Sequence, residues 1–193
     1  AWPGNYSYEQ GYLLGLLVGD GTLKEDKAVL SVWPMLAVAN GTEGGLDGGV
    51  QAVMEEALRA AKSLPHRSDF RGWQAVTGRG EHRLATAALK HLANELGMRP
   101  GDKQITPALE QASSDCYRGF LRGMFDSDGS VQGSQAKGVS VRLAQSDLPR
   151  LEAVQRMLLR LGIASTIYKK RRSAGATHLP DGKGGSAEYA TKA

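Results

Sequence analysis

The stretch GYLLGLLVGDG at residues 11–21 is repeated as GFLRGMFDSDG at residues 119–129, at a constant offset of 108 residues. Five positions are identical in the two copies, including two aligned glycines and the closing Asp-Gly pair. A match of this length, with its glycines in phase, indicates duplication or fusion of one unit. We therefore expect two related halves, residues 1–111 and residues 112–193.

Each copy is expected to be a helix that ends at its Asp-Gly pair, because glycine commonly terminates helices. Small residues recur every four positions, which places them on one helix face. Glycine inside a helix costs roughly 1 kcal/mol relative to alanine, and close packing of the two helices would compensate for it. The alternative is a pair of ordinary core helices with incidental glycines. The small residues are Gly11, Gly15, Gly19, Gly119, Gly123 and Ser127.

Asp20 and Asp128 close the two copies, so packing of the glycine faces would bring both carboxylates to one end of the helix pair. Two neighbouring carboxylates repel each other unless a cation lies between them. Oxygen donors and concentrated negative charge suit Mg²⁺ or a similar divalent ion, as in metal-assisted phosphodiesterases. A single Asp-Gly pair is only a turn signal, whereas two of them in register on packed helices favour a metal site.

Residues 13–21 and 121–129 are similar to the nine-residue signature of the LAGLIDADG homing endonucleases. The resemblance implies an α+β fold of two pseudo-symmetric αββαββα units, packed through paired signature helices, with saddle-like antiparallel sheets. It also implies that Asp20 and Asp128 bind the catalytic metal, with Gly19 and Ser127 beside them as further ligands.

The same resemblance assigns further site residues. Lys103 lies in GDKQITP, residues 101–107, which is similar to a Lys-x-Ile-Pro pattern of the family. It would orient or polarise the nucleophilic water, or stabilise charge near the phosphate; the alternative is a solvated surface lysine. Gln145 is expected to assist from a strand of the second half. Asp126 occupies the penultimate acidic position of the second signature, where the first copy has Val18, and we expect Asp126 to be structural.

Periodicity in the rest of the chain predicts helices at residues 50–64, 81–96 and 148–161, and strands at 27–33, 67–77, 139–145 and 165–172. The strands are expected to contact DNA, because arginine and glutamine read bases in the major groove while basic runs hold phosphates. For any one of these residues the alternative is a solvated sheet face. The candidate DNA contacts are Arg67, Arg71, Trp73, Gln74, Gln132, Ser140, Arg142, Lys169 and Arg171.

The second half is shorter than the first beyond its signature, so we expect its last strand and closing helices to be shortened or missing. The net charge of +4 fits a polyanionic partner without establishing one. The single cysteine, Cys116, excludes a disulfide framework and a multi-cysteine zinc site, and is expected to be buried. Neither a signal sequence nor a span of ~20 apolar residues is present.

The leading hypothesis is a site-specific double-strand DNA endonuclease that uses Mg²⁺, with Mn²⁺ or Ca²⁺ substituting for binding. Its partner would be duplex DNA with a long asymmetric target, and no membrane. We expect a monomer in the cytoplasm, associated with the nucleoid in a bacterium or archaeon. The alternative is a non-cleaving DNA-binding regulator or RNA maturase on the same fold. An intein origin is expected to leave only the endonuclease portion here, because no splicing residues lie at the two ends.

Overall fold

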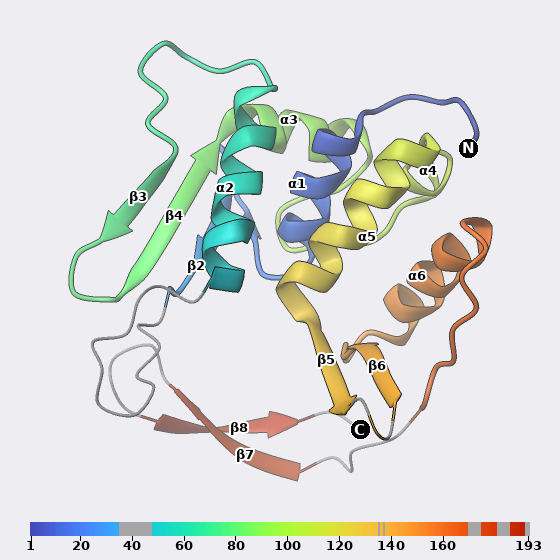
Figure 1. Ribbon diagram of the computed structural model, residues 1–193. Helices are drawn as coiled ribbons and strands as arrows, with labels where there is room; N and C mark the ends of the chain where they lie inside the picture. Colours follow the sequence, from blue (N-terminus) through green and yellow to red (C-terminus); the bar gives the residue numbers. More distant parts are fainter. Residues whose placement is uncertain (35–47, 135, 137, 170–174, 181–185, 192–193) are drawn as a thin grey trace. The chain divides into compact units, whose positions relative to one another are not determined.

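The computed structural model describes residues 1–34, 48–134, 136, 138–169, 175–180 and 186–191, which belong to two compact units (Figure 1). Unit 1 is Ala1–Ala144 and unit 2 is Gln145–Ala193. Along the chain, helix-strand-strand-helix-strand-strand occurs twice. The first occurrence is followed by a closing helix and a short extra helix. The mixed α+β class and this order of elements are as predicted. The proposed duplication boundary at residues 111/112 is a different division, and it stays a prediction.

Two helices, α1 (Tyr8–Val18) and α5 (Ser114–Asp128), lie side by side at the centre of unit 1 (Figure 1). Each begins at a serine whose side chain accepts a backbone N–H, which satisfies an otherwise unpaired helix donor. Ser7 forms a reciprocal capping box with Gln10, and Ser113 accepts from the N–H of Cys116. Every residue of α1 from 11 to 18 is buried, and Cys116 is buried as expected.

The glycines of α1 and α5 face each other at the helix contact. A Cβ added to Gly15 would lie 2.9 Å from the Met124 nitrogen, and one added to Gly123 would lie 2.8 Å from the Leu16 nitrogen. Real side-chain carbons essentially never approach within 3.0 Å of such atoms. The predicted close packing of the two helices is therefore confirmed. The same crowding holds at Gly11 and Gly119.

Unit 1 also contains a four-stranded antiparallel sheet in the order β1-β2-β4-β3. Its strands are β1 (Thr22–Leu23), β2 (Ala28–Val32), β3 (Trp73–Val76) and β4 (Glu81–Thr86). Helix α2 (Gly48–Lys62) connects β2 to β3, and α3 (Ala87–Glu95) follows β4. The short α4 (Pro107–Glu110) leads into α5. Strand β4 lies between β2 and β3. The β3–β4 hairpin therefore joins the β1–β2 hairpin through the pairing of β4 with β2.

The two faces of this sheet differ in chemistry. Leu30, Leu84 and Trp73 are registered neighbours on three strands, and the two leucines are buried. The Trp73 indole donates to the Met54 carbonyl of α2 at 2.8 Å, so this face is turned toward the helices. The opposite face, which we call the outer face, is more polar. It carries Thr22, Ser31, Gln74, Glu81 and Arg83 along with Val29, Val76 and Ala85.

Directly after α5, β5 (Gly129–Ser134) and β6 (Gly138–Leu143) form an antiparallel hairpin. Its residues alternate strictly: one face is polar, and the other carries Val131, Val139 and Val141, each more than half exposed. The predicted strand at residues 139–145 is thus confirmed as β6.

Unit 2 contains α6 (Leu148–Arg160) and a second antiparallel hairpin of β7 (Gly175–Pro180) and β8 (Ser186–Thr191). Asp147 caps α6 by accepting the N–H of Arg150, which fits the preference of aspartate for this position. The predicted helices at residues 148–161 and 50–64 are confirmed as α6 and α2.

The prediction of one helix over residues 81–96 is wrong in its first part. Residues 81–86 form β4, and the helix begins only after Thr86, whose hydroxyl accepts the N–H of Ala88. These residues carry helix-compatible types, but pairing with strands on both sides decides their conformation. The strand expected over residues 67–77 is likewise restricted to β3.

The predictions for the end of the chain need two corrections. No strand lies at residues 165–169, and β7 begins only at Gly175, while residues 170–174 are outside the described parts. The last strand, expected to be shortened or missing, is present as β8, which is 6 residues long. No strand was predicted at residues 175–180 (GATHLP), because this stretch lacks the alternation of apolar and polar residues that indicates one. No helix in the described ranges is both long and apolar enough to cross a membrane.

Candidate active site and nucleic-acid interface

The two signature aspartates come together at the C-terminal ends of α1 and α5. Asp128 is the last residue of α5, and Asp20 follows Gly19, the C-cap of α1. A Cβ added to Gly19 would lie 2.8 Å from the Ser127 Cβ and 3.0 Å from the Asp128 Oδ2. The Asp128 carboxylate therefore lies against the backbone that carries Asp20. All four residues predicted to form the metal site are gathered at this point.

Lys103 reaches the same place from the segment before α4. Its ammonium group donates hydrogen bonds to the carbonyl oxygens of Leu17, at 2.8 Å, and Gly21. These carbonyls belong to the last turn of α1 and the residues just beyond it. A cation at a helix C-terminus offsets the negative end of the helix dipole. Lys103 thus stabilises the turn that carries Asp20.

The Asp20 carboxylate keeps contact with solvent but is partly desolvated. Its burial raises the pKa of Asp20 above the ordinary value, and the charge of Lys103 lowers it. No group in the described residues donates a hydrogen bond to this carboxylate. A desolvated acid without a hydrogen-bond donor gains more than most from a bound cation.

The donor set fits a hard divalent ion. The described residues contain no cluster of three or more His, Cys, Asp or Glu suited to a metal. Two carboxylates at one point, with backbone carbonyls beside them, leave the remaining ligand positions of an ion to water or substrate. Mg²⁺ commonly keeps several waters in this way and binds through one or two carboxylates. The set therefore fits Mg²⁺ and does not resemble a zinc site.

Asp126 has a different role from its two neighbouring signature residues. It accepts a hydrogen bond from the Tyr12 hydroxyl at 2.8 Å and lies 3.5 Å from the Arg122 Nε. Burial, followed by the hydrogen bond to Asp126, raises the pKa of Tyr12 far above its usual value. The carboxylate thereby connects α5 to α1. This agrees with the expectation that Asp126 is structural.

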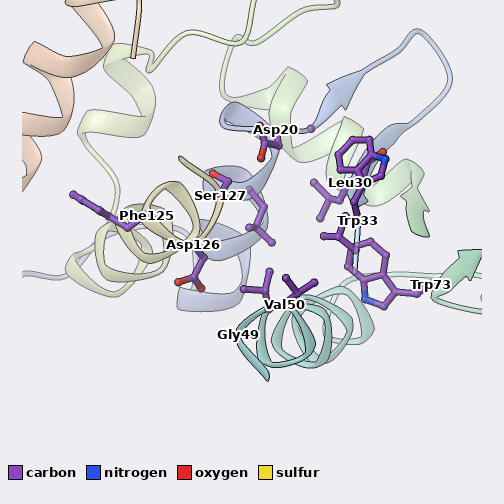
Figure 2. Close-up of a pocket in the computed structure, with 14 residues that line it drawn as sticks. Asp20, Leu30, Trp33, Gly49, Val50, Trp73, Phe125, Asp126 and Ser127 are labelled. Carbon is purple, nitrogen blue, oxygen red and sulfur yellow. The ribbon is translucent and has the colours of Figure 1, made fainter. Parts of the chain in front are cut away.

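A cleft of about 470 Å³ opens beside Asp20 (Figure 2). Asp20 and Ser127 lie on one side of it, while Trp33 and Trp73 lie on the other, above Val50 of α2 (Figure 2). Its walls are mostly apolar, and the two carboxylates that line it are those of Asp20 and Asp126. The cleft therefore borders Asp20, whereas Asp128 is not among its lining residues.

Gln145 is the first residue of unit 2. Its side-chain oxygen accepts a hydrogen bond from Arg150 Nη1 at 3.3 Å. Its assistance at the carboxylates stays a prediction.

The candidate DNA contacts of the first half gather around an open depression of about 910 Å³ in unit 1. Arg67, Arg71 and Gln74 all line it, and Arg67 is paired with Asp69 at 3.1 Å. Trp73 does not line it, because its side chain is on the helix-facing side of the sheet and borders the other cleft. Trp73 and Gln74 thus point to opposite faces.

The candidate contacts on the β5–β6 hairpin share one polar face. Ser140 is registered opposite Gln132, and Arg142 opposite Ser130. The Arg142 guanidinium donates to the side-chain oxygens of Gln132 and Ser140. The three predicted residues therefore form one connected cluster, on the face opposite the exposed valines.

The other two candidates lie in the second unit. Lys169 is exposed, and its ammonium group is 3.4 Å from Glu152. Arg171 lies outside the described residues.

Sequence interpretation missed two residues of the outer face, Glu81 and Arg83. They were assigned to a helix, whereas in β4 they point the same way and form an ion pair at 2.6 Å. Their spacing of two residues was the signal that could have revealed them, because it is the repeat of a strand.

Residues 115–187 match the family model described as LAGLIDADG-like domain. The chain is 26% identical over 186 residues to two curated proteins named ribonucleoside-diphosphate reductase NrdEB subunit alpha, from Bacillus subtilis (strain 168) and from Bacillus phage SPbeta. The match covers 94% of this chain but only 17% of each relative.

Among solved structures, the chain is similar to one titled "The crystal structure of I-DmoI in complex with DNA and Mn". The identity is 15% and the TM-score is 0.47, with 97% of this chain and 91% of that chain covered. The family model covers the second signature, and α1 carries the first copy of that signature, packed against α5. Over residues 115–187 the chain is therefore similar to a LAGLIDADG-like domain.

Proposed function

We propose that this chain is a site-specific endonuclease that hydrolyses both strands of duplex DNA with the help of divalent metal ions. The observation that carries the proposal is the convergence of Asp20 and Asp128 at the ends of two interlocked helices. A structural helix pair has no need of two carboxylates side by side at the end of its contact face. A phosphodiesterase does need them there.

Asp20 and Asp128 would hold Mg²⁺, with the backbone carbonyls of Gly19 and Ser127 as further ligands. When bound, the ion would polarise a phosphoryl oxygen and lower the pKa of a water nucleophile. Lys103 fixes the turn that carries Asp20 and adds a positive charge beside it. That charge would also favour the developing negative charge on the phosphate. Gln145 is proposed to orient a water or a phosphate oxygen.

The two polar strand faces are proposed to bind the duplex. In unit 1 the outer face and the neighbouring depression present arginine and glutamine, and the β5–β6 hairpin presents its own cluster of serine, glutamine and arginine. These side chains are the ones that read base edges in a major groove. Since the two faces differ in sequence, a monomer would recognise an asymmetric target.

We further propose that the endonuclease is carried within a longer host protein, as an intein-type element. The curated relatives support this, because 94% of the chain matches only 17% of their length. Their names suggest one target to include first, the coding sequence of a ribonucleoside-diphosphate reductase alpha subunit. Action on cellular DNA would place the protein in the cytoplasm, at the nucleoid of a bacterium or archaeon.

The decisive experiment is a cleavage assay on a library of random duplexes, supplemented with that reductase coding sequence. The purified chain is incubated with Mg²⁺, Mn²⁺ or EDTA, and cut ends are identified by sequencing. We expect cuts at one site, dependent on the metal, and their loss in the Asp20→Asn plus Asp128→Asn variant. Asp126→Asn is the matched control, because it removes a carboxylate from the same helix end without touching the proposed metal ligands.

Two other results would replace the proposal. Tight, salt-sensitive binding to DNA without cleavage in any metal would indicate a regulator. A preference for structured RNA would indicate a maturase. Cleavage that survives in the double variant would show that the carboxylate pair is not the catalytic site.

A further inference from the structure

A row of polar side chains crosses three strands on the outer face of the unit 1 sheet. Arg83 on β4 is registered with Ser31 on β2 and with Gln74 on β3. Registered residues on neighbouring strands point to the same face. This face is turned away from the buried Leu84 and from the helices. Arg83 is at the centre of the row.

Glu81 lies two residues before Arg83 and shares its face. The Arg83 guanidinium donates two hydrogen bonds to it, from Nε at 2.6 Å and from Nη2 at 2.9 Å. The Glu81 side chain is only 5% exposed, which is unusual for an ionised group. The bonds from Arg83 lower the pKa of Glu81 more than its burial raises it, and Ser31 lowers it further. The pair is therefore ionised at neutral pH.

The two bonds occupy only one edge of the guanidinium. Arginine has five N–H donors in a planar fork, and no described residue accepts a hydrogen bond from Arg83 Nη1. The second edge, formed by Nη1 and Nη2, remains available on a side chain that is 41% exposed. An arginine held along one edge presents the other edge in a fixed direction. The O6 and N7 atoms of guanine match that edge.

The Glu81 carboxylate also determines which part of DNA Arg83 is suited to bind. A lone arginine adds to the attraction for every phosphate. The ion pair of Arg83 and Glu81 carries no net charge, and the Glu81 carboxylate repels phosphates. Arg67 and Arg71, at the depression that Arg83 also lines, are better placed to supply phosphate contacts. The ion pair with Glu81 therefore makes Arg83 better suited to bind a base edge than the phosphate backbone of DNA.

We propose that Arg83, oriented by Glu81, reads one guanine in the major groove of the bound duplex. Arg83 is a specificity-determining residue, and Glu81 is a positioning residue that acts through it. The inference rests on the proposed function, because it requires a bound duplex.

The test is a binding profile in Ca²⁺. A target is first selected for the wild-type chain from random duplexes, and binding is then measured to every single base-pair change of that target. The profile and the salt dependence are repeated for Arg83→Ala, Arg83→Lys and Glu81→Gln. Arg118→Ala is the matched control, because Arg118 is also ion-paired with a carboxylate but lies on α5. Thermal melting shows that each variant is folded.

For Arg83→Ala we expect discrimination to fall at one guanine by roughly 5- to 150-fold, the range for a bidentate contact, and to be unchanged elsewhere. Arg83→Lys should lose part of the same discrimination, because an ammonium group lacks the planar fork that can hold Glu81 along one edge and guanine along the other. Glu81→Gln should lose part of it while binding all sequences more tightly, with a steeper salt dependence. A uniform loss of affinity in Arg83→Ala would overturn the inference, as would an unchanged profile in Glu81→Gln. If the wild-type chain selects no duplex at all, the proposed function fails instead.

Discussion

Replacing Gly123 with alanine tests whether close contact between α1 and α5 stabilises unit 1. The new Cβ would lie 2.8 Å from the Leu16 nitrogen and closer still to the Tyr12 carbonyl oxygen. Both are backbone atoms of α1, so no flexible side chain can move out of the way. The two helices would have to separate along their most tightly packed stretch.

Two opposing effects set the magnitude. Alanine is favoured over glycine inside a helix by about 1 kcal/mol. Overpacking of a well-packed contact costs about 1–3 kcal/mol, and a clash with backbone belongs at the upper end. We therefore expect Gly123→Ala to lower the free energy of unfolding by about 2 kcal/mol, which corresponds to about 4–8 °C in Tm for a chain of this size.

Urea and thermal unfolding measure this effect, with Gly48→Ala as the control. Gly48 is also helical, but a Cβ there would meet nothing within 4 Å, so its replacement should leave stability equal or slightly higher. If Gly123→Ala were as stable as Gly48→Ala, the glycines would not be a packing requirement. The helix pair would then be an ordinary core contact.

Three further predictions concern the side chains around this contact. Lys103→Met should lower the free energy of unfolding by about 1–3 kcal/mol in urea titrations, because carbonyls at the end of α1 lose their donor; Lys103→Arg should recover part of it. Tyr12→Phe should lower it by about 1 kcal/mol by deleting the hydrogen bond to Asp126, and no loss would mean that the bond contributes nothing. Since Arg83 lowers the pKa of Glu81, the Glu81 carboxylate stabilises the fold above the unfolded pKa near 4.5. That contribution is lost as pH falls through the folded pKa, so the stability gap between wild type and Glu81→Gln should narrow in acid; a gap that widens would refute it.

The helix pair and its carboxylates could be predicted because the glycine spacing that determines them is local, and the sequence contains it twice. Glycines in phase indicate close approach wherever the helices pack, and the repeat identifies the partner of each helix. The positions of Asp20 and Asp128 then follow from geometry alone. Lys103 could be placed near them only by its resemblance to a family pattern, since nothing in its own segment indicates that it reaches the end of α1.

The parts that could not be predicted depend on partners distant in sequence. Residues 81–86 have types that a helix tolerates, and only pairing with β2 and β3 makes them a strand. The ion pair of Glu81 and Arg83 was hidden for the same reason. Trp73 was assigned to the DNA-contacting set because strand period alone does not say which face is buried. The contact with Met54 on α2 decides that it is on the inner face.

The stripe of small residues connects the stability of unit 1 to its proposed chemistry. The same face that lets α1 and α5 touch at Gly15 and Gly123 continues to Gly19 and Ser127, directly beside the Asp128 carboxylate. Separation of the helices at the middle of the stripe would therefore also change the distance between the two carboxylates. Reacting groups misplaced by ~1 Å can lose roughly 100-fold in rate, so the spacing of the helices would matter to the proposed catalysis as well as to folding. The small residues at the ends of both helices serve both needs, because a Cβ on Gly19 would lie only 2.8 Å from the Ser127 Cβ.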